Sequence, residues 1–128
     1  MKILIAEDDV ANAKFLSKYL SKFGDVVITP DGIAAVDEFV NALERGEMFG
    51  LVCLDIMMPK IDGYTATRVI RSTNRQDAKV IPIIAMTAHV FDEDVKQCLE
   101  AGMNAHLPKP LQMEKVVSTI ARLCKRKK

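Results

Sequence analysis

The sequence predicts one α/β domain built on a doubly wound parallel sheet with helices on both faces. Short apolar runs alternate five times with segments of helical periodicity, which is typical of parallel strands joined by right-handed crossovers. The runs are continuously aliphatic, as expected for strands that helices cover on both sides. At 128 residues the chain has the size of one domain with one core.

The first half of the chain contains three predicted strands and two predicted helices. The strands are residues 3–6, 26–29 and 51–54. Asp9 and Asp31 are placed to cap the helices, because Asp is a preferred N-cap residue, and Gly24 and Gly46 end them. The apolar stripes keep the spacing of a helix face: Ala13, Leu16, Leu20 and Phe23 in the first helix, and Ile33, Val36, Phe39, Val40 and Leu43 in the second.

The second half begins with a loop punctuated by Pro59 and Gly63, followed by a helix over 64–71 and a polar connection over 72–79. The fourth and fifth strands are predicted over 80–86 and 105–107. Between them lies a helix marked by Phe91, Val95 and Leu99 and ended by Gly102; the last helix is marked by Met113, Val116, Val117, Ile120 and Leu123. We therefore expect a domain over 1–124, a solvated basic tail over 125–128, and no output domain.

Composition excludes several classes of protein. With 18 basic and 17 acidic residues the net charge is +1, which gives no reason to expect direct nucleic-acid binding. No apolar segment is long enough to cross a membrane, and the opening residues do not form a signal peptide. Cys53, Cys98 and Cys124 are odd in number and lack a metal-binding spacing, so we expect core residues and a reducing cytoplasm.

Acidic residues follow two of the predicted strands. Glu7, Asp8 and Asp9 come after the first strand, and Asp55 ends the third. If these strands are parallel neighbours, the carboxylates converge at one sheet edge, where repulsion and desolvation would raise their pKa values unless a cation compensates. Ligand crevices of such sheets lie beyond the carboxyl ends of the strands. The pattern therefore predicts a divalent metal site there.

Four separated motifs occur along the chain in the order found in one protein family. They are Glu7-Asp8; the segment 54–59 with Asp62-Gly63 behind it; Met86-Thr87-Ala88; and Lys109-Pro110. With these motifs the chain resembles a receiver domain of the two-component response regulators over essentially its whole length. The resemblance implies a flavodoxin-like sheet with strand order 2-1-3-4-5 and a cis peptide bond before Pro110.

The resemblance also implies a metal and a phosphoacceptor. Asp55 would accept the phosphoryl group, and Mg²⁺ or Mn²⁺ would be bound by Asp8, Asp55 and the Met57 backbone carbonyl, with Glu7 reached through water. The chemistry agrees, because transfer to a carboxylate needs positioning and positive charge around a loose transition state, and Mg²⁺ prefers oxygen ligands and retained waters.

Further roles are implied for four side chains. Lys109 would contact the phosphoryl oxygens, and the Thr87 hydroxyl would turn inward to bond one of them. His106 stands where the family commonly has Tyr or Phe; it either keeps a switching role with pH dependence or is merely half exposed. Met57 and His89 match positions that influence hydrolysis of the phospho-aspartate. Since Met57 cannot orient a water, we expect a long-lived phosphorylated state.

These features imply a phosphoacceptor regulatory domain, with no enzyme activity beyond limited self-phosphorylation and self-dephosphorylation. The donor would be a histidine kinase or a histidine phosphotransfer protein. We expect signalling through the face of the fourth helix, fifth strand and fifth helix, in a monomer or a phosphorylation-dependent dimer without membrane contact. The chain would be a free-standing regulator or a receiver from a hybrid kinase, and Asn12 gives its segment a faint resemblance to the hybrid type. In the hybrid case, a histidine phosphotransfer protein would dock near the first helix.

Two other functions remain open from the sequence. The first is a Mg²⁺-dependent phosphatase with an aspartyl nucleophile, although Asp55-Ile56-Met57 lacks the second acid of the Asp-x-Asp motif. The second is nucleotide or flavin binding. The segment 7–13 carries acids and no glycine where phosphates would need backbone donors, which disfavours it.

Overall fold

The computed structural model contains a five-stranded, all-parallel sheet with the order β2-β1-β3-β4-β5. The predicted fold class and strand order are therefore confirmed. The structure describes residues 1–58, 60–73, 76–87 and 92–125. The strands are β1 (Lys2–Ala6), β2 (Asp25–Thr29), β3 (Phe49–Asp55), β4 (Ile83–Thr87) and β5 (Ala105–Pro108).

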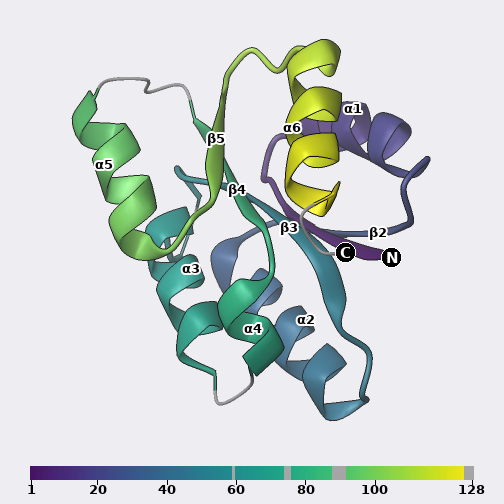
Figure 1. Cartoon of the computed structure of the whole chain (residues 1–128), viewed down its shortest axis with the longest axis vertical. Coiled ribbons are helices and arrows are strands. Elements are labelled where there is room, and N and C mark those ends of the chain that lie inside the picture. Colours follow the sequence, from purple (N-terminus) through teal and green to yellow (C-terminus); the bar gives the residue numbers. More distant parts are fainter. Residues whose placement is uncertain (59, 74–75, 88–91, 126–128) are drawn as a thin grey trace.

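Helices cover both faces of this sheet. They are α1 (Val10–Leu20), α2 (Gly32–Glu44), α3 (Gly63–Ser72), α4 (Gln76–Val80), α5 (Asp92–Ala101) and α6 (Met113–Lys125). Figure 1 shows α1 and α6 on one side of the sheet and the other helices on the opposite side. None of the helices in the described part of the chain has the length and apolarity needed to cross a bilayer.

The interior strand β1 shows how one sheet supports two cores. Ile3 and Ile5 belong to the core under α1 and α6, whereas Leu4 and Ala6 belong to the core under the other helices. All four are fully buried, because successive side chains of a strand point to opposite faces and helices cover both. The continuous apolar runs of the sequence follow from this arrangement.

An aspartate is the N-cap residue of α1, α2 and α3. Asp9 and Asp31 accept hydrogen bonds from the Asn12 and Ala34 amides at 3.1 and 2.8 Å, as predicted for the caps of α1 and α2. Asp62 caps α3 in the same way, accepting from the Thr65 amide at 2.7 Å. The peptide bond before Pro110 is cis, as the resemblance implied.

The short helix α4 was not predicted. The sequence suggested a polar connection running into a strand from Val80, but Val80 ends α4 with 63% of its surface exposed. Pro82 cannot donate a ladder hydrogen bond, and the strand begins after it, at Ile83. The predicted fourth and fifth helices are consequently α5 and α6, so the predicted signalling face consists of α5, β5 and α6.

The predicted helix faces are partly wrong. On α2 the buried centre is Ala35, Phe39 and Ala42, while Ile33 is 43% exposed. On α5 the buried residues include Cys98 and Ala101, while the predicted core residue Leu99 is 62% exposed. The buried centre of α2 thus combines two alanines with Phe39, and that of α5 is made of smaller side chains than the predicted Leu99. Phe23 lies beyond α1 and is 36% exposed, Met113 is 41% exposed, and Phe91, His89 and the side chain of Cys124 lie outside the described residues.

Candidate functional site

The strand register brings two acidic segments together at the carboxyl edge of the sheet. β1 and β3 are adjacent, with Ala6 opposite Leu54, so Glu7 and Asp55 both follow this last pair. One carboxylate oxygen from each of Glu7, Asp8 and Asp55 lies within 4.8 Å of the others. Glu7 and Asp55 are buried, and Asp8 is exposed. The convergence predicted from the sequence is therefore present.

Lys109 extends into this acidic cluster from the far end of the chain. Its ammonium lies 2.7 Å from Asp55 Oδ2 and 3.1 Å from Glu7 Oε1. The side chains are 20% exposed for Lys109, 5% for Asp55 and none for Glu7. Burial alone would lower the pKa of Lys109, but the hydrogen bond to Asp55 and the charge of both carboxylates outweigh it and raise this pKa.

Glu7 has an unusual environment. Burial, followed by the proximity of Asp55, raises its pKa from 4.5 to about 7. Its Oε2 accepts a hydrogen bond from the Asp9 amide at 3.2 Å. Its Oε1 is buried and has no hydrogen-bond partner, because the approach of the Lys109 ammonium makes an ion pair without hydrogen-bond geometry. A buried carboxylate oxygen in this state favours a cation beside it.

The donor set fits a divalent cation. It consists of carboxylate oxygens of Glu7, Asp8 and Asp55, which Mg²⁺ and Mn²⁺ prefer, and Glu7 also carries the unsatisfied Oε1. Asp8 is exposed, so it lies on the solvent side of the cluster. Asp55 Oδ1 accepts a hydrogen bond from the Met57 amide at 3.1 Å, which fixes the carboxylate and places this backbone next to the site.

Gly63 packs closely against the backbone of Asp55 and Ile56. A Cβ at this position would lie 2.6 Å from the Asp55 carbonyl oxygen and 3.0 Å from Ile56 Cα, both of which are backbone atoms. The Gly63 amide donates to the Ile56 carbonyl at 3.0 Å. Glycine is thus required for α3 to begin against the end of β3. The Asp62-Gly63 pair entered the sequence interpretation only as part of a family motif, and this contact was not predicted.

Lys60 is a residue whose role the sequence interpretation missed. Its φ of 74° lies in the left-handed region, and its ammonium lies 3.5 Å from Asp31 Oδ2. The Ala34 amide, and then Lys60, hold the pKa of Asp31 below its ordinary value. The pair joins the loop after β3 to the start of α2. No simple sequence signal identifies it.

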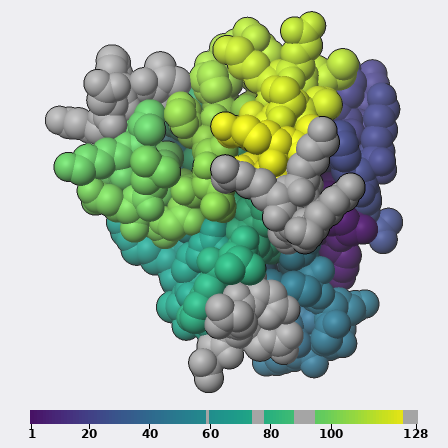
Figure 2. All heavy atoms as spheres, in the orientation of Figure 1, coloured from purple at the N-terminus to yellow at the C-terminus, as the bar shows by residue number. Residues whose placement is uncertain are grey.

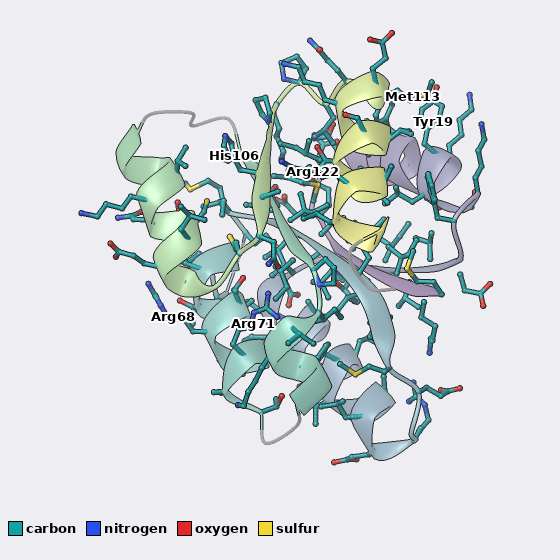
Figure 3. The ribbon with its side chains drawn as sticks, viewed as in Figure 1. Tyr19, Arg68, Arg71, His106, Met113 and Arg122 are labelled. Atoms are coloured by element: carbon teal, nitrogen blue, oxygen red, sulfur yellow. The ribbon has the colours of Figure 1, made fainter. Side chains whose placement is uncertain are left out.

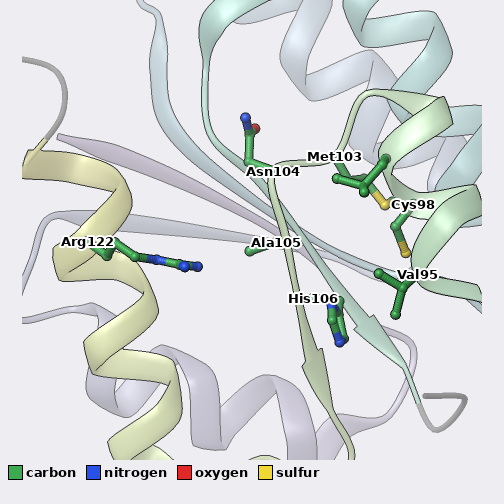
Figure 4. Close-up of a pocket in the computed structure, with 8 residues that line it drawn as sticks. Val95, Cys98, Met103, Asn104, Ala105, His106 and Arg122 are labelled. Atoms are coloured by element: carbon green, nitrogen blue, oxygen red, sulfur yellow. The ribbon is translucent and has the colours of Figure 1, made fainter. Parts of the chain in front are cut away.

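Thr87 and His106 lie on the neighbouring strands. Thr87 is buried at the end of β4, opposite Pro108, and its carbonyl accepts a hydrogen bond from the Lys109 amide at 2.8 Å. His106 is half-buried on β5. It lines a cavity of about 250 Å³ between α5, β5 and α6, toward which Arg122 of α6 extends (Figure 4). His106 therefore faces the predicted signalling surface.

Figure 2 shows this surface from outside. The yellow-green atoms around β5 lie between the green atoms of α5 and the yellow atoms of α6. The remaining residues that line the cavity are Val95, Cys98, Leu99, Met103, Asn104 and Ala105. Their mixture of apolar and polar groups, at the margin of one sheet edge, is compatible with a binding surface.

The doubly wound parallel sheet, with an acidic cluster and a lysine at its carboxyl edge, defines a flavodoxin-like α/β domain with a charged site at the strand ends. The family model described as "Response regulator receiver domain" matches residues 3–121. The chain therefore belongs to the receiver domains of two-component signalling, a family of regulatory phosphoacceptor domains and not of classical enzymes.

Curated relatives place similar receiver domains in larger proteins. The chain is 33% identical over 137 residues to the probable histidine kinase 2 of Oryza sativa, and 33% identical over 126 residues to the osmosensing histidine protein kinase SLN1 of Saccharomyces cerevisiae. It is 36% identical over 124 residues to the yeast transcription factor SKN7. These matches cover 99%, 97% and 96% of this chain but only 13%, 10% and 18% of the relatives.

Solved receiver domains have the same fold. The receiver domain of the sensor histidine kinase PA1611 from Pseudomonas aeruginosa is 32% identical, with a TM-score of 0.80 and 97% coverage of both chains; its structure has a magnesium ion coordinated in the active-site cleft. The BeF3-activated DrrB receiver domain is 30% identical, with a TM-score of 0.80, and the match covers 98% of this chain and 97% of that one.

Proposed function

We propose that the domain is a phosphorylation switch in which Asp55 accepts a phosphoryl group from a histidine kinase or a histidine phosphotransfer protein. The observation that carries this proposal is the part-buried Asp55–Lys109 contact of 2.7 Å inside a cluster of three carboxylates. A carboxylate held beside an ammonium, with oxygen donors for a divalent ion next to it, has the charges that transfer of a phosphoryl group requires.

The transfer step uses groups at known positions. A carboxylate oxygen of Asp55 forms a bond to phosphorus while the phosphorus–nitrogen bond of the donor phosphohistidine breaks. The electron pair leaves with the imidazole nitrogen, which then takes a proton. Lys109 neutralises charge on the phosphoryl oxygens, and Thr87, at the end of the adjacent strand β4 along the same edge, supplies a hydroxyl to one of them.

Asp8, Asp55, the Met57 carbonyl and, through water, Glu7 would hold the Mg²⁺ or Mn²⁺. When bound, the ion supplies positive charge next to the transferring oxygens. The fit rests on the oxygen donors and on the unsatisfied Glu7 Oε1. The PA1611 receiver domain, which has magnesium in its cleft, supports the proposal by similarity.

Signalling would leave through α5, β5 and α6, where His106 lines the cavity beside the site strands. We propose that His106 takes part in this change, and that a donor docks beside the start of α1. Val10 and Met57, which are 67% and 65% exposed, offer apolar surface there and next to Asp55. The domain would be a monomer or a phosphorylation-dependent dimer, with a downstream protein target.

Intact mass spectrometry after incubation with acetyl phosphate and Mg²⁺ tests the proposal. We expect the parent to gain one phosphoryl group and Asp55→Asn to gain none. Asp62→Asn is the matched control, because it changes an aspartate of the same loop into a residue that also caps helices, and it should label like the parent. Equal labelling of Asp55→Asn, or labelling undiminished by EDTA, would contradict the proposal.

The phosphatase alternative gains no support from the described site. The position two residues after Asp55 is Met57, whose side chain is largely exposed and offers no carboxylate. Turnover of a phosphate ester by the parent, at a rate that Asp55→Asn abolishes, is the result that would favour this alternative.

A further inference from the structure

Arg71, near the end of α3, binds segments that are distant in the sequence. Its Nε and Nη2 donate to the Gly102 carbonyl at 3.0 and 2.8 Å, and its Nη1 donates to the Ala78 carbonyl at 3.0 Å. Nη2 also donates to Asn104 Oδ1 at 2.8 Å. Figure 3 shows Arg71 between α3, α4 and the lower end of α5, whereas Arg68 on the same helix points outward.

This guanidinium is part-buried without a carboxylate partner among the described side chains. Burial lowers its pKa. The Gly102 and Ala78 carbonyls and the Asn104 side-chain oxygen accept its hydrogen bonds and provide the compensating negative partial charge. The flat fork of arginine reaches two carbonyls and one amide at once, a geometry that lysine cannot reproduce.

Asn104 extends the same junction to the sheet. Its side-chain Oδ1 also accepts a hydrogen bond from the Ile83 backbone amide at 2.8 Å, and its backbone amide donates to the Ile83 carbonyl at 2.8 Å. Gly102 has φ +105°, and a Cβ there would lie 3.1 Å from Arg71 Cγ, so the chain passes directly over the arginine stem. Arg71 and Asn104 thus fasten the turn after α5 to the amino ends of β4 and β5.

The opposite ends of β4 and β5 lie at the edge of the sheet that carries Asp55. β4 begins at this junction and ends at Thr87; β5 begins there and leads into Lys109. α5 lies between these strands in the sequence and ends one residue before Gly102. β4 and β5 therefore each have one end at the acidic cluster and one end at Arg71.

We propose that Arg71 is a positioning residue that acts as a fixed pivot for the signalling face. A change at Asp55 displaces the site-side parts of β4, α5 and β5, while Gly102 and Asn104 stay in place. The cavity between α5 and β5 then changes shape at its Val95 and His106 end and keeps its Asn104 end. This inference rests on the proposed function of Asp55.

Amide hydrogen exchange by NMR tests the pivot in the intact chain, with Mg²⁺ alone and with Mg²⁺ and beryllofluoride. In the parent we expect beryllofluoride to change exchange at Val95 and to leave Gly102 and Asn104 unchanged. In Arg71→Lys, exchange at Gly102 and Asn104 should rise about tenfold or more, because the fork to two carbonyls is lost, and both should now respond to beryllofluoride. Arg68→Gln, on the exposed side of α3, should behave like the parent.

Three results would overturn the pivot. They are a parent in which Asn104 responds as strongly as Val95, an Arg71→Lys protein with unchanged protection at Gly102, and an Arg68→Gln protein that loses the same protection. A parent that shows no response anywhere, and no phosphoryl group on Asp55 by mass, removes the proposed function together with the pivot. Arg71→Lys keeps the positive charge and most of the aliphatic stem, so it removes the fork with the least disturbance to folding.

Discussion

Replacing Lys109 with methionine should destabilise the protein by an amount that depends strongly on pH. The ammonium is the cation within 3.1 Å of Glu7 and 2.7 Å of Asp55, whose side chains are 0% and 5% exposed. Methionine keeps the length of the side chain and removes its charge. The variant therefore leaves two buried carboxylates facing each other, which is the costly way to break a buried pair.

The magnitude follows from burial and from the pKa of Glu7. Removing one partner of a buried pair costs about 3–5 kcal/mol, and the partial exposure of Lys109 favours the lower end, about 3 kcal/mol at pH 8. The rise in the pKa of Glu7 from 4.5 to about 7 means that the folded state binds this proton more tightly than the unfolded state. At about 1.36 kcal/mol per pKa unit, ionising folded Glu7 costs on the order of 3 kcal/mol.

The sign gives the pH window. Because the folded pKa of Glu7 is raised, its contribution to stability is lost as pH increases from about 4.5 to about 7. The raised pKa of Lys109 keeps it charged throughout this range. Without Lys109 the pKa of Glu7 rises further, so most of the destabilisation by Lys109→Met should appear above pH 7 and little of it near pH 5.

Urea unfolding at pH 5 and pH 8, with EDTA throughout, measures the effect. Lys60→Met is the matched control, since that lysine is 60% exposed, pairs at 3.5 Å, and should contribute less than about 1 kcal/mol. Adding Glu7→Gln to Lys109→Met should restore stability at pH 8. Equal destabilisation at both pH values, or no restoration by the second change, would refute the electrostatic reasoning.

Three further predictions concern the site. Mg²⁺ at about 100 times its Kd should stabilise the parent by about 2.7 kcal/mol, visible as a higher Tm, and Asp8→Ala should lose this shift; a parent Tm insensitive to Mg²⁺ contradicts the metal site. Gly63→Ala should cost about 1–3 kcal/mol in urea unfolding and displace the backbone of Asp55, seen as amide shifts, whereas unchanged shifts would show that the loop accommodates a methyl group. Met57→Asn should shorten the half-life of phosphorylated protein, followed by intact mass over time, because an amide can orient water; an unaltered half-life removes the basis for a long-lived state.

The fold could be predicted because its determinants are local and repeated. Continuous aliphatic runs such as residues 51–54 arise only where both sheet faces are covered, and capping aspartates mark helix starts. The exposed Leu99 could not be predicted, because Cys98 and Leu99 are equally plausible on a helical wheel and only packing distance to the sheet decides between them. The helix α4 is too short to produce a periodic signal.

The site divides in the same way. The position of the acids, of Thr87 and of Lys109 follows from strand order, and the resemblance to receiver domains supplied the roles expected of Lys109 and Thr87. Arg71, by contrast, sits in a helical stretch like any surface arginine, and its partners Gly102 and Asn104 lie 31 and 33 residues away. A lone arginine carries no pattern that reveals such long-range bonds, so only the structure shows them.

The hydrogen bond from the Lys109 amide to the Thr87 carbonyl has a practical consequence for protein engineering. It joins the backbone that carries the Lys109 ammonium to the backbone that carries the Thr87 hydroxyl, at the ends of neighbouring strands. A designer who transplants the chemistry of this domain into another scaffold should therefore move residues 83–87 and 105–110 as a unit. Grafting Lys109 alone would transfer its positive charge but not its alignment with Thr87.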